Sequence, residues 1–504
     1  MTRSASESST PKGDSFTAVA LAVGLAALVA RALPALGQAF WIDEAGTWWL
    51  IDGGWSELVA RWRAWPYQSL AHSGVTLAAR QLLGPGEWAL RLPTVLAAAA
   101  SLVLWHRLAR RLIGPVGAAA TLLALFGSPA FYFALTMARP YALGLLALTV
   151  SWTALVAWAE DGATWRLALW AAASAAVGYF HFTLALGLLA QLPFVAMAWS
   201  NADAQRRRRF ALAAAAALLA CLPLAGSLRA TAAGLPALRM YRDVGGGEHA
   251  LVVLTPTVLG FQLLVVVAAA IAHGAWPVFG ARPASRRAFL VLAPLWLIPT
   301  LVTSLAHSLH LAALNLDRYQ MAGQLGLALA VGLTVDRLEP ARARRTAIAL
   351  LVFLAPFTAV TRYWPLYDGC DWRAAARASP QLAAPDDLVL VPSKFIESSH
   401  PAHFAELENV GKLSALLVAY PIAGRVVPLP RDVLPETTEF AARRLRAALL
   451  DERQRFVLLH VNSGDWLQWL QREHPEFRLL RRYHWGRLDW LVFERRAPPA
   501  PAGG

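Results

Sequence analysis

Two neighbouring carboxylates stand among aromatic residues in the stretch Phe40-Trp41-Ile42-Asp43-Glu44-Ala45-Gly46-Thr47-Trp48-Trp49. They directly follow the first long apolar segment, Thr17 to Leu36. Ionised acids at the end of an apolar segment are costly unless water or a cation lies near them. A carboxylate in this position can act as a general base that takes the proton of an attacking hydroxyl. We therefore take Asp43 as the candidate catalytic base and Glu44 as a second catalytic candidate.

Cationic and hydrogen-bonding side chains recur near the ends of other apolar segments. Arg139 and Arg318 are candidate ligands for a phosphate leaving group, because a guanidinium group offers two parallel hydrogen bonds to an anion. The candidate substrate-binding residues are Tyr141, His181, Tyr319, Asp317 and His72. Each residue alone has an ordinary explanation, such as a solvated acid pair, an arginine that reaches lipid headgroups, or a packed histidine. Their common location, argued below, favours a functional site.

The composition is that of a membrane protein. Of 504 residues, 57% are hydrophobic, and the mean hydropathy is +0.44. The formal net charge of +14 would suggest nucleic acid in a soluble protein. In a membrane protein, Arg collects in cytoplasmic loops, so we expect no nucleic-acid partner. The two cysteines, Cys221 and Cys370, form neither a disulfide framework nor a metal-binding spacing.

Hydropathy predicts about eleven transmembrane helices, each near the roughly 20 residues that a bilayer requires. The first, Thr17 to Leu36, has two interpretations, a cleaved signal peptide or an uncleaved span. We adopt the uncleaved span, because the rest of the chain is also apolar. The other ten are expected near 91–107, 116–136, 140–159, 167–181, 183–200, 210–228, 252–275, 288–306, 319–335 and 346–361.

Every second connection between these segments is rich in arginine, with 160–166 the weakest case. The positive-inside rule places these connections in the cytoplasm, together with a disordered N-terminus at 1–15. The transmembrane domain is then 16–361, and the chain after it lies outside. The arginines concerned are Arg107, Arg110, Arg111, Arg166, Arg206 to Arg209, Arg282, Arg286, Arg287, Arg337, Arg342, Arg344 and Arg345.

Two regions outside the membrane have their own predicted structure. In the first outer loop, 37–90, apolar residues from Trp55 to Trp65 recur at helical spacing, and 70–83 forms a second such pattern. The tryptophan content of the first pattern predicts a helix lying in the membrane interface, and the second is expected to be a helix of the same kind. Residues 362–496 predict a small α/β domain, followed by a disordered tail at 497–504. Its strands are expected at 387–391, 455–461, 477–483 and 488–494, and its helices at 371–382, 402–418, 437–451 and 463–473.

This topology places the acidic pair, both candidate arginines and His181 on the outer side of the membrane, in four separate connections. We expect these connections to converge on one cavity. A base, cations for a phosphate and hydrogen-bonding aromatic residues are the groups needed to move a sugar from a lipid phosphate to a hydroxyl. Direct displacement by the hydroxyl would invert the anomeric carbon.

The sequence resembles the C-type, lipid-phosphate-sugar-dependent membrane glycosyltransferases. It is most similar to the bacterial branch related to protein O-mannosyltransferases and lipid A aminoarabinose transferases. The matching stretches are Trp41-Ile42-Asp43-Glu44-Ala45, Leu83-Gly84-Pro85-Gly86-Glu87-Trp88-Ala89-Leu90-Arg91-Leu92-Pro93, Ala138-Arg139-Pro140-Tyr141-Ala142-Leu143, Tyr179-Phe180-His181-Phe182 and Arg318-Tyr319. Many relatives carry Pro-Pro or His-Pro where this chain has Trp65-Pro66-Tyr67-Gln68, which leaves the acceptor type open.

The resemblance implies a polyprenyl-phosphate sugar donor, an inverting mechanism and Asp43 as the base. It implies that Glu44 either orients the acceptor or binds a divalent metal, with His181 as a further metal candidate; no cofactor is certain. We expect a hexosyl- or pentosyltransferase of the bacterial plasma membrane, with membrane lipids and an extracytoplasmic acceptor as partners. A lipid-linked saccharide flippase is the alternative from another class, although mid-span acids and repeats typical of transporters are not evident. An O-antigen-type polymerase using diphosphate-linked donors also stays open.

Overall fold

The computed structural model describes residues 15–65, 68–229, 260–274, 283–309, 317–358, 365–366, 368–399, 404, 407–448, 450–461 and 464–496. The chain divides into two compact units. The first, here called the helical unit, comprises Met1–Leu33, Ser69–His72 and Arg91–Val360. The second, here called the mixed unit, comprises Pro34–Gln68, Ser73–Leu90 and Thr361–Gly504. Segments of the first predicted outer loop therefore belong to the same unit as the C-terminal region.

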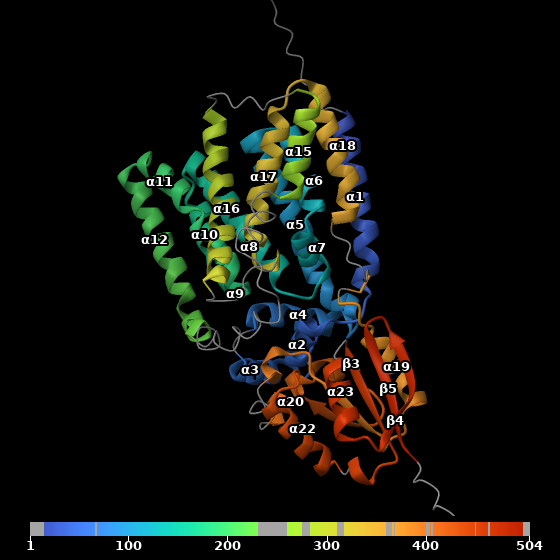
Figure 1. Ribbon diagram of the computed structural model, residues 1–504. Coiled ribbons are helices and arrows are strands. Elements are labelled where there is room, and N and C mark those ends of the chain that lie inside the picture. Colours follow the sequence, from blue (N-terminus) through green and yellow to red (C-terminus); the bar gives the residue numbers. More distant parts are fainter. Residues whose placement is uncertain are drawn as a thin grey trace, which may run out of the picture. The chain divides into compact units, whose positions relative to one another are not determined.

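Apolar helices of different lengths build the helical unit (Figure 1). They are α1 (Ser15–Leu36), α5 (Glu87–Ile113), α6 (Pro115–Phe126), α7 (Pro129–Thr136), α8 (Tyr141–Asp161), α9 (Thr164–Phe180), α10 (Leu186–Leu189), α11 (Leu192–Ser200), α12 (Ala204–Cys221), α15 (Phe261–Ala272), α16 (Pro283–Ser308), α17 (Met321–Arg337) and α18 (Ala341–Thr358), with a 3-10 turn at Phe182–Ala185. Glycines allow α6 and α17 to pack backbone to backbone. A Cβ atom added at Gly332 would come within 2.4 Å of the Gly117 carbonyl oxygen. Small residues at such contacts are typical of helices packed in membranes.

The described residues contain six helices that are long and apolar enough to cross a bilayer, or seven if the bent pair α6 and α7 forms one span. The prediction of a polytopic helical membrane protein is therefore confirmed. The number of eleven spans stays a prediction, since α9, α17 and α18 match predicted spans but do not meet these criteria. The predicted span 252–275 is described only over 260–274.

The segment predicted as a span over 116–136 is bent. The axis bends by 70° between α6 and α7. The chain carries its own break signals here, because Gly127 ends α6 and the Ser128 hydroxyl accepts a hydrogen bond from the Phe131 N–H at 3.3 Å. Such a side chain satisfies one of the free N–H groups of the first helical turn.

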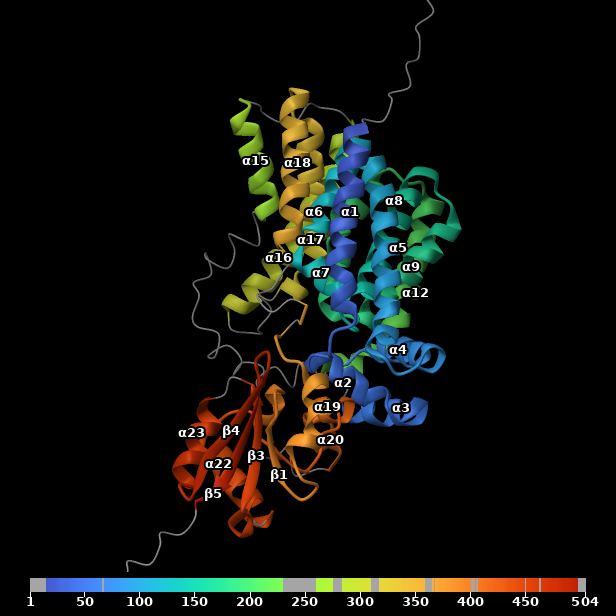
Figure 2. The same ribbon diagram turned by 90° about the vertical axis from the view of Figure 1, so that its right-hand side faces the viewer.

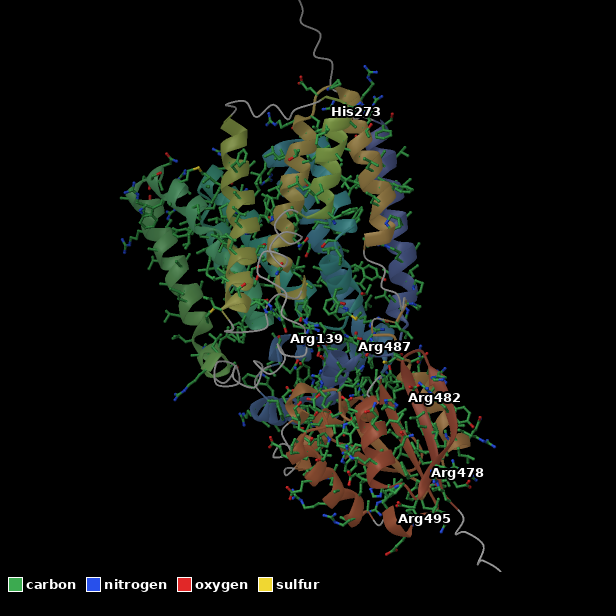
Figure 3. The ribbon with its side chains drawn as sticks, viewed as in Figure 1. Arg139, His273, Arg478, Arg482, Arg487 and Arg495 are labelled. Carbon is green, nitrogen blue, oxygen red and sulfur yellow. The ribbon has the colours of Figure 1, made fainter. Side chains whose placement is uncertain are left out.

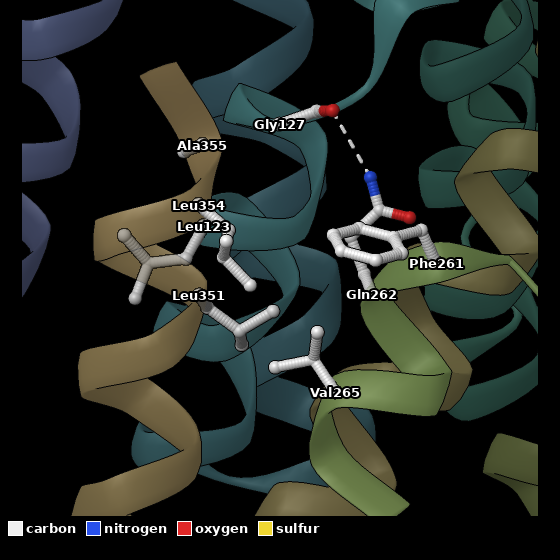
Figure 4. A pocket seen from close by; sticks show the side chains of 8 residues that line it. All are labelled: Leu123, Gly127, Phe261, Gln262, Val265, Leu351, Leu354 and Ala355. Atoms are coloured by element: carbon white, nitrogen blue, oxygen red, sulfur yellow. Dashed lines mark hydrogen bonds between the residues drawn. The ribbon is translucent and has the colours of Figure 1, made fainter. Parts of the chain in front are cut away.

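Carbonyl groups freed at this break find side-chain donors. Arg31 of α1 donates to the Phe126 carbonyl at 2.8 Å and to the Ala355 carbonyl of α18 at 2.6 Å. Gln262 of α15 donates to the Gly127 carbonyl at 3.0 Å (Figure 4). Side-chain donors that bind the freed carbonyl groups permit a broken helix in an apolar environment.

Three of these helices, α6, α15 and α18, border a small apolar crevice (Figure 4). It is lined by Leu123, Gly127, Phe261, Gln262, Val265, Leu351, Leu354 and Ala355. None of the predicted site residues lines it, so we assign it no part in catalysis.

Connections that were predicted to be cytoplasmic meet at one end of the helical unit. Arg287 forms an ion pair with Glu160 at 3.8 Å, and Arg209 donates to the Thr164 hydroxyl at 3.1 Å. Figure 3 shows His273 at one end of this unit and Arg139 toward the other. The segregation agrees with the predicted alternation of loops, while the side of the membrane on which each end lies stays a prediction.

The mixed unit begins with short helices and continues into a sheet with flanking helices. Its helices are α2 (Ile42–Ile51), α3 (Gly54–Ala64), most of α4 (Leu70–Leu83), α19 (Trp372–Leu382), α20 (Leu407–Leu413), α21 (Ala415–Ala419), α22 (Pro435–Ala447) and α23 (Gly464–Glu473). Helices α3 and α4 form where the sequence predicted them. Their location in the membrane interface stays a prediction.

The sheet has five strands in the order β2-β1-β3-β5-β4. They are β1 (Leu388–Pro392), β2 (Arg425–Leu429), β3 (Arg455–Val461), β4 (Phe477–Trp485) and β5 (Leu488–Arg495). Strands β1, β2 and β3 are parallel, and β5 is antiparallel to β3 and β4. Buried residues of α22 and α23 share the core of one face, and α19 packs against β4 and β5 (Figure 2). Four strands lie at predicted positions, whereas β2 was not predicted.

Candidate functional site

The acidic pair lies in the first turn of α2, where the positive end of the helix dipole favours negative charge. Glu44 is fully buried, and its carboxylate accepts a hydrogen bond from the Trp41 backbone N–H at 3.3 Å. This contact caps the helix. Asp43 is partly exposed. The two acids therefore differ in accessibility, and Asp43 is the one that a substrate hydroxyl could reach.

Residues of the C-terminal region surround this turn of α2 within the mixed unit. Phe395 lies against Gly46, where an added Cβ atom would be 3.7 Å from the ring. Lys412 is only 4% exposed, and its Nζ is 2.8 Å from a Glu397 carboxylate oxygen. Burial lowers the pKa of Lys412, and the charges of Glu397 and Asp43 oppose that shift. Asp43 and Lys412 are thus close enough to attract one another.

A second polar network anchors the chain just before Asp43. The Tyr420 hydroxyl accepts from the Phe40 N–H at 2.7 Å and donates to Glu87 at 2.8 Å. Arg373 pairs with the same Glu87 carboxylate at 3.1 Å and donates to the Gly37 carbonyl at 2.9 Å. Glu87 therefore fixes the segment that leads into α2, which is a structural role.

In the helical unit, aromatic rings gather around His181. Its ring centroid lies 4.7 Å from that of Tyr141 and 6.0 Å from that of Tyr319. The Thr183 hydroxyl is 2.8 Å from His181 Nδ1, which fixes the orientation of the ring. Tyr141 is buried, and its ring also contacts Phe133 of α7 at 5.4 Å. A cluster that was predicted from separate connections therefore forms within this unit.

Two arginines and a second histidine belong to the same cluster. The charges of Arg139 and Arg318 both act on the His181 ring. The Arg318 guanidinium lies 5.3 Å from the centroid of Tyr319, and the turn Asp317–Tyr319 packs against α7. Arg139 is largely buried, so its charge is poorly screened by water. Concentrated positive charge beside hydrogen-bonding rings is suited to an anionic ligand such as phosphate.

Burial and the nearby charge of Arg139 lower the pKa of His72 from its ordinary value of 6.5 to about 3. The folded protein therefore holds this ring neutral, whereas the unfolded chain protonates it below about pH 6.5. The stability contributed by this group is complete above that pH and declines as the pH falls toward 3. By pH 5 the loss is about 2 kcal/mol.

We expect His72→Gln to reduce this acid sensitivity. The midpoint of thermal unfolding, measured in detergent at pH 7 and pH 5, should fall further for the unmodified protein than for the variant. His273→Gln, at an exposed histidine, is the control and should behave like the unmodified protein. Equal losses in all three proteins would show that His72 does not couple protonation to unfolding.

The predicted site residues fall in two groups. The helical unit brings together His72, Arg139, Tyr141, His181, Arg318 and Tyr319; the mixed unit holds Asp43 and Glu44. The meeting of the two groups at one cavity stays a prediction. The side chain of Asp317 lies outside the described residues. No group of three or more potential metal ligands occurs in the described part of the chain.

Sequence reasoning did not single out Lys412, Glu397 or Tyr420. One signal for Lys412 was available. The chain has 46 basic residues, and only Lys12, Lys394 and Lys412 among them are lysines. A lysine inside the apolar stretch Val410-Gly411-Lys412-Leu413 is therefore unusual in this chain, whose basic residues are nearly all arginines. Tyr420 and Glu397 lie far along the chain from α2, and no local pattern marks their contacts.

Comparisons with known proteins place these groups in context. The family model of dolichyl-phosphate-mannose-protein mannosyltransferases matches residues 75–226. The crystal structure of ArnT from Cupriavidus metallidurans bound to undecaprenyl phosphate matches with a TM-score of 0.55 and 15% identity, over 95% of this chain and 97% of that chain. The apo structure of the same ArnT matches with a TM-score of 0.52 and 15% identity, over 95% and 96%.

No curated protein gives a significant match to the sequence. The family model and the shared fold confirm the predicted resemblance to C-type membrane glycosyltransferases. At 15% identity the two structures establish the fold alone.

Proposed function

We propose that this chain, with the fold of a C-type membrane glycosyltransferase, transfers a sugar from a polyprenyl phosphate to a hydroxyl of an extracytoplasmic acceptor. The observation that carries the proposal is the cluster in the helical unit. Arg139 and Arg318 act together on His181, which lies between two tyrosine rings. The ArnT structure that shares this fold was solved with undecaprenyl phosphate, which supports a donor of the same class.

In the proposed reaction, the donor phosphate binds at Arg139 and Arg318. Breaking the bond between the sugar and the phosphate leaves negative charge on the phosphate oxygens, and the two guanidinium groups stabilise that charge. His181, Tyr141 and Tyr319 border the position of the donor headgroup. His72 remains neutral and adds packing rather than charge.

Asp43 serves as the general base. The acceptor hydroxyl transfers its proton to the Asp43 carboxylate as its oxygen bonds to the anomeric carbon. Attack from the side opposite the phosphate inverts that carbon. Glu44 holds the first turn of α2 through its contact with Trp41 and thereby keeps Asp43 in place.

Comparative mass spectrometry tests the proposal. Envelope lipids, glycans and glycoproteins would be compared between the source bacterium, a deletion strain, and deletion strains that express the natural protein or Asp43→Asn. We expect a sugar modification to disappear on deletion, to return with the natural protein and to stay absent with the variant. Restoration by Asp43→Asn, or identical profiles in all strains, would contradict sugar transfer by this protein.

A further inference from the structure

A buried lysine of the C-terminal region has no role in the mechanism described so far. The Nζ of Lys412 lies 2.8 Å from Glu397, 3.2 Å from the ring centroid of Trp65 and 5.7 Å from that of Phe395. A lysine that is 4% exposed is costly unless charge and ring contacts compensate its lost hydration. The burial of the Lys412 ammonium group therefore indicates a structural or a functional role.

The residues around Lys412 pack against α2, the helix that carries Asp43. Helix α20, which contains Lys412, packs against α2. A Cβ atom added at Gly411 would lie 2.9 Å from the Trp49 indole nitrogen of α2. Phe395 contacts Gly46, one turn along the helix from Asp43. The element that carries Lys412 is therefore packed on α2, and the ammonium group itself contacts Glu397, Trp65 and Phe395.

The charges that act on Lys412 come from two carboxylates. Glu397, from the 3-10 turn Ile396–Ser399, forms the direct pair, and Asp43 of α2 attracts the ammonium group as well. One cation thus interacts with a structural acid and with the candidate base. Glu397 competes with Asp43 for that charge.

We propose that Lys412 is a positioning residue for Asp43: its ammonium group, held by Glu397 and Trp65, attracts the Asp43 carboxylate and thereby orients it. This inference rests on the proposed function, in which Asp43 is the base. The C-terminal region then completes the catalytic base, and a chain that lacks this region would be inactive.

The pH dependence of transfer distinguishes this role from a merely structural one. The assay uses membrane vesicles of the deletion strain that carry each variant, with their endogenous lipid-linked donor and acceptor. It quantifies the glycan that the deletion strain lacks. Removing a cation beside a carboxylate favours its protonated form, so Lys412→Met should move the acid limb of the rate profile to higher pH. We expect the transfer rate measured on that limb to fall severalfold.

Three further variants make the result decisive. Lys412→Arg keeps the charge and should retain the acid limb of the natural protein. Glu397→Gln removes the competing anion and should move the limb to lower pH. Lys394→Met is the control, since this lysine pairs with Asp368 at 2.6 Å and should leave the profile unchanged.

An unchanged acid limb in Lys412→Met would overturn the inference. If that variant does not accumulate in membranes, Glu397→Gln decides, and the absence of a downward shift would overturn it. Activity in Asp43→Asn would instead overturn the proposed function itself. An inactive Asp43→Asn together with an unshifted Lys412→Met would overturn the role of Lys412 alone.

Discussion

An Asp43→Asn variant should accumulate in the membrane at a nearly normal level and lose sugar transfer by a factor of about 10² to 10⁴. Asparagine keeps the size of the side chain but cannot accept the proton of the attacking hydroxyl. The loss of one negative charge from the first turn of α2 should cost stability by only about 0.3–1 kcal/mol. Transfer rates in vesicles, normalised to the amount of protein, provide the measurement.

Asp52→Asn is the matched control. Asp52 follows the last residue of the same helix and pairs with Arg80 at 3.0 Å, so the substitution makes the same chemical change at the opposite end of α2. This variant should transfer sugar at nearly the normal rate. Full activity in Asp43→Asn, or equal losses in both variants, would remove Asp43 from the mechanism.

The second large effect is expected for Arg139→Ala. The substitution removes a largely buried guanidinium group from the cluster around His181. Loss of one group that stabilises charge developing in a transition state lowers rates by about 10² to 10³. We expect kcat/KM for the lipid-linked donor to fall by that factor, while the KM for the acceptor changes little.

Arg139→Lys should recover part of the loss, because lysine restores the charge without the paired hydrogen bonds of arginine. Arg166→Ala removes an arginine from a connection that was predicted to be cytoplasmic, where it pairs with Asp161 at 2.8 Å, and should have no effect on donor use. A larger effect on the acceptor than on the donor would argue against a phosphate role for Arg139.

Hydropathy and local spacing predicted much of the secondary structure. The apolar spacing of the first loop predicted α3 and α4, and short segments rich in apolar and aromatic residues predicted β1, β3, β4 and β5. Strand β2 was not predicted because Pro428 lies within it, and proline normally argues against a strand. Its place at the edge of the sheet explains why the proline is tolerated. The bend at Gly127 and Ser128 was missed because hydropathy outweighed the break signals.

Site residues were predictable where the residue type and the predicted side of the membrane were enough to assign them. Arg139, His181 and Arg318 were assigned to the same side from the alternation of arginine-rich loops, and the structure brings them together. The interactions of Lys412 and Tyr420 with the segment around Asp43 were not predictable, because they join residues more than 300 positions apart. Such contacts depend on how the sheet and its helices fold, which no local pattern specifies.

The mechanism requires Asp43 and the two arginines to act on one donor molecule. A cryo-electron microscopy structure of the full-length protein in lipid nanodiscs with undecaprenyl phosphate tests this requirement most directly. We predict that the bound phosphate contacts the guanidinium groups of Arg139 and Arg318 and that the Asp43 carboxylate faces the same chamber. A phosphate bound away from both arginines, or an Asp43 separated from the phosphate by protein, would contradict the account.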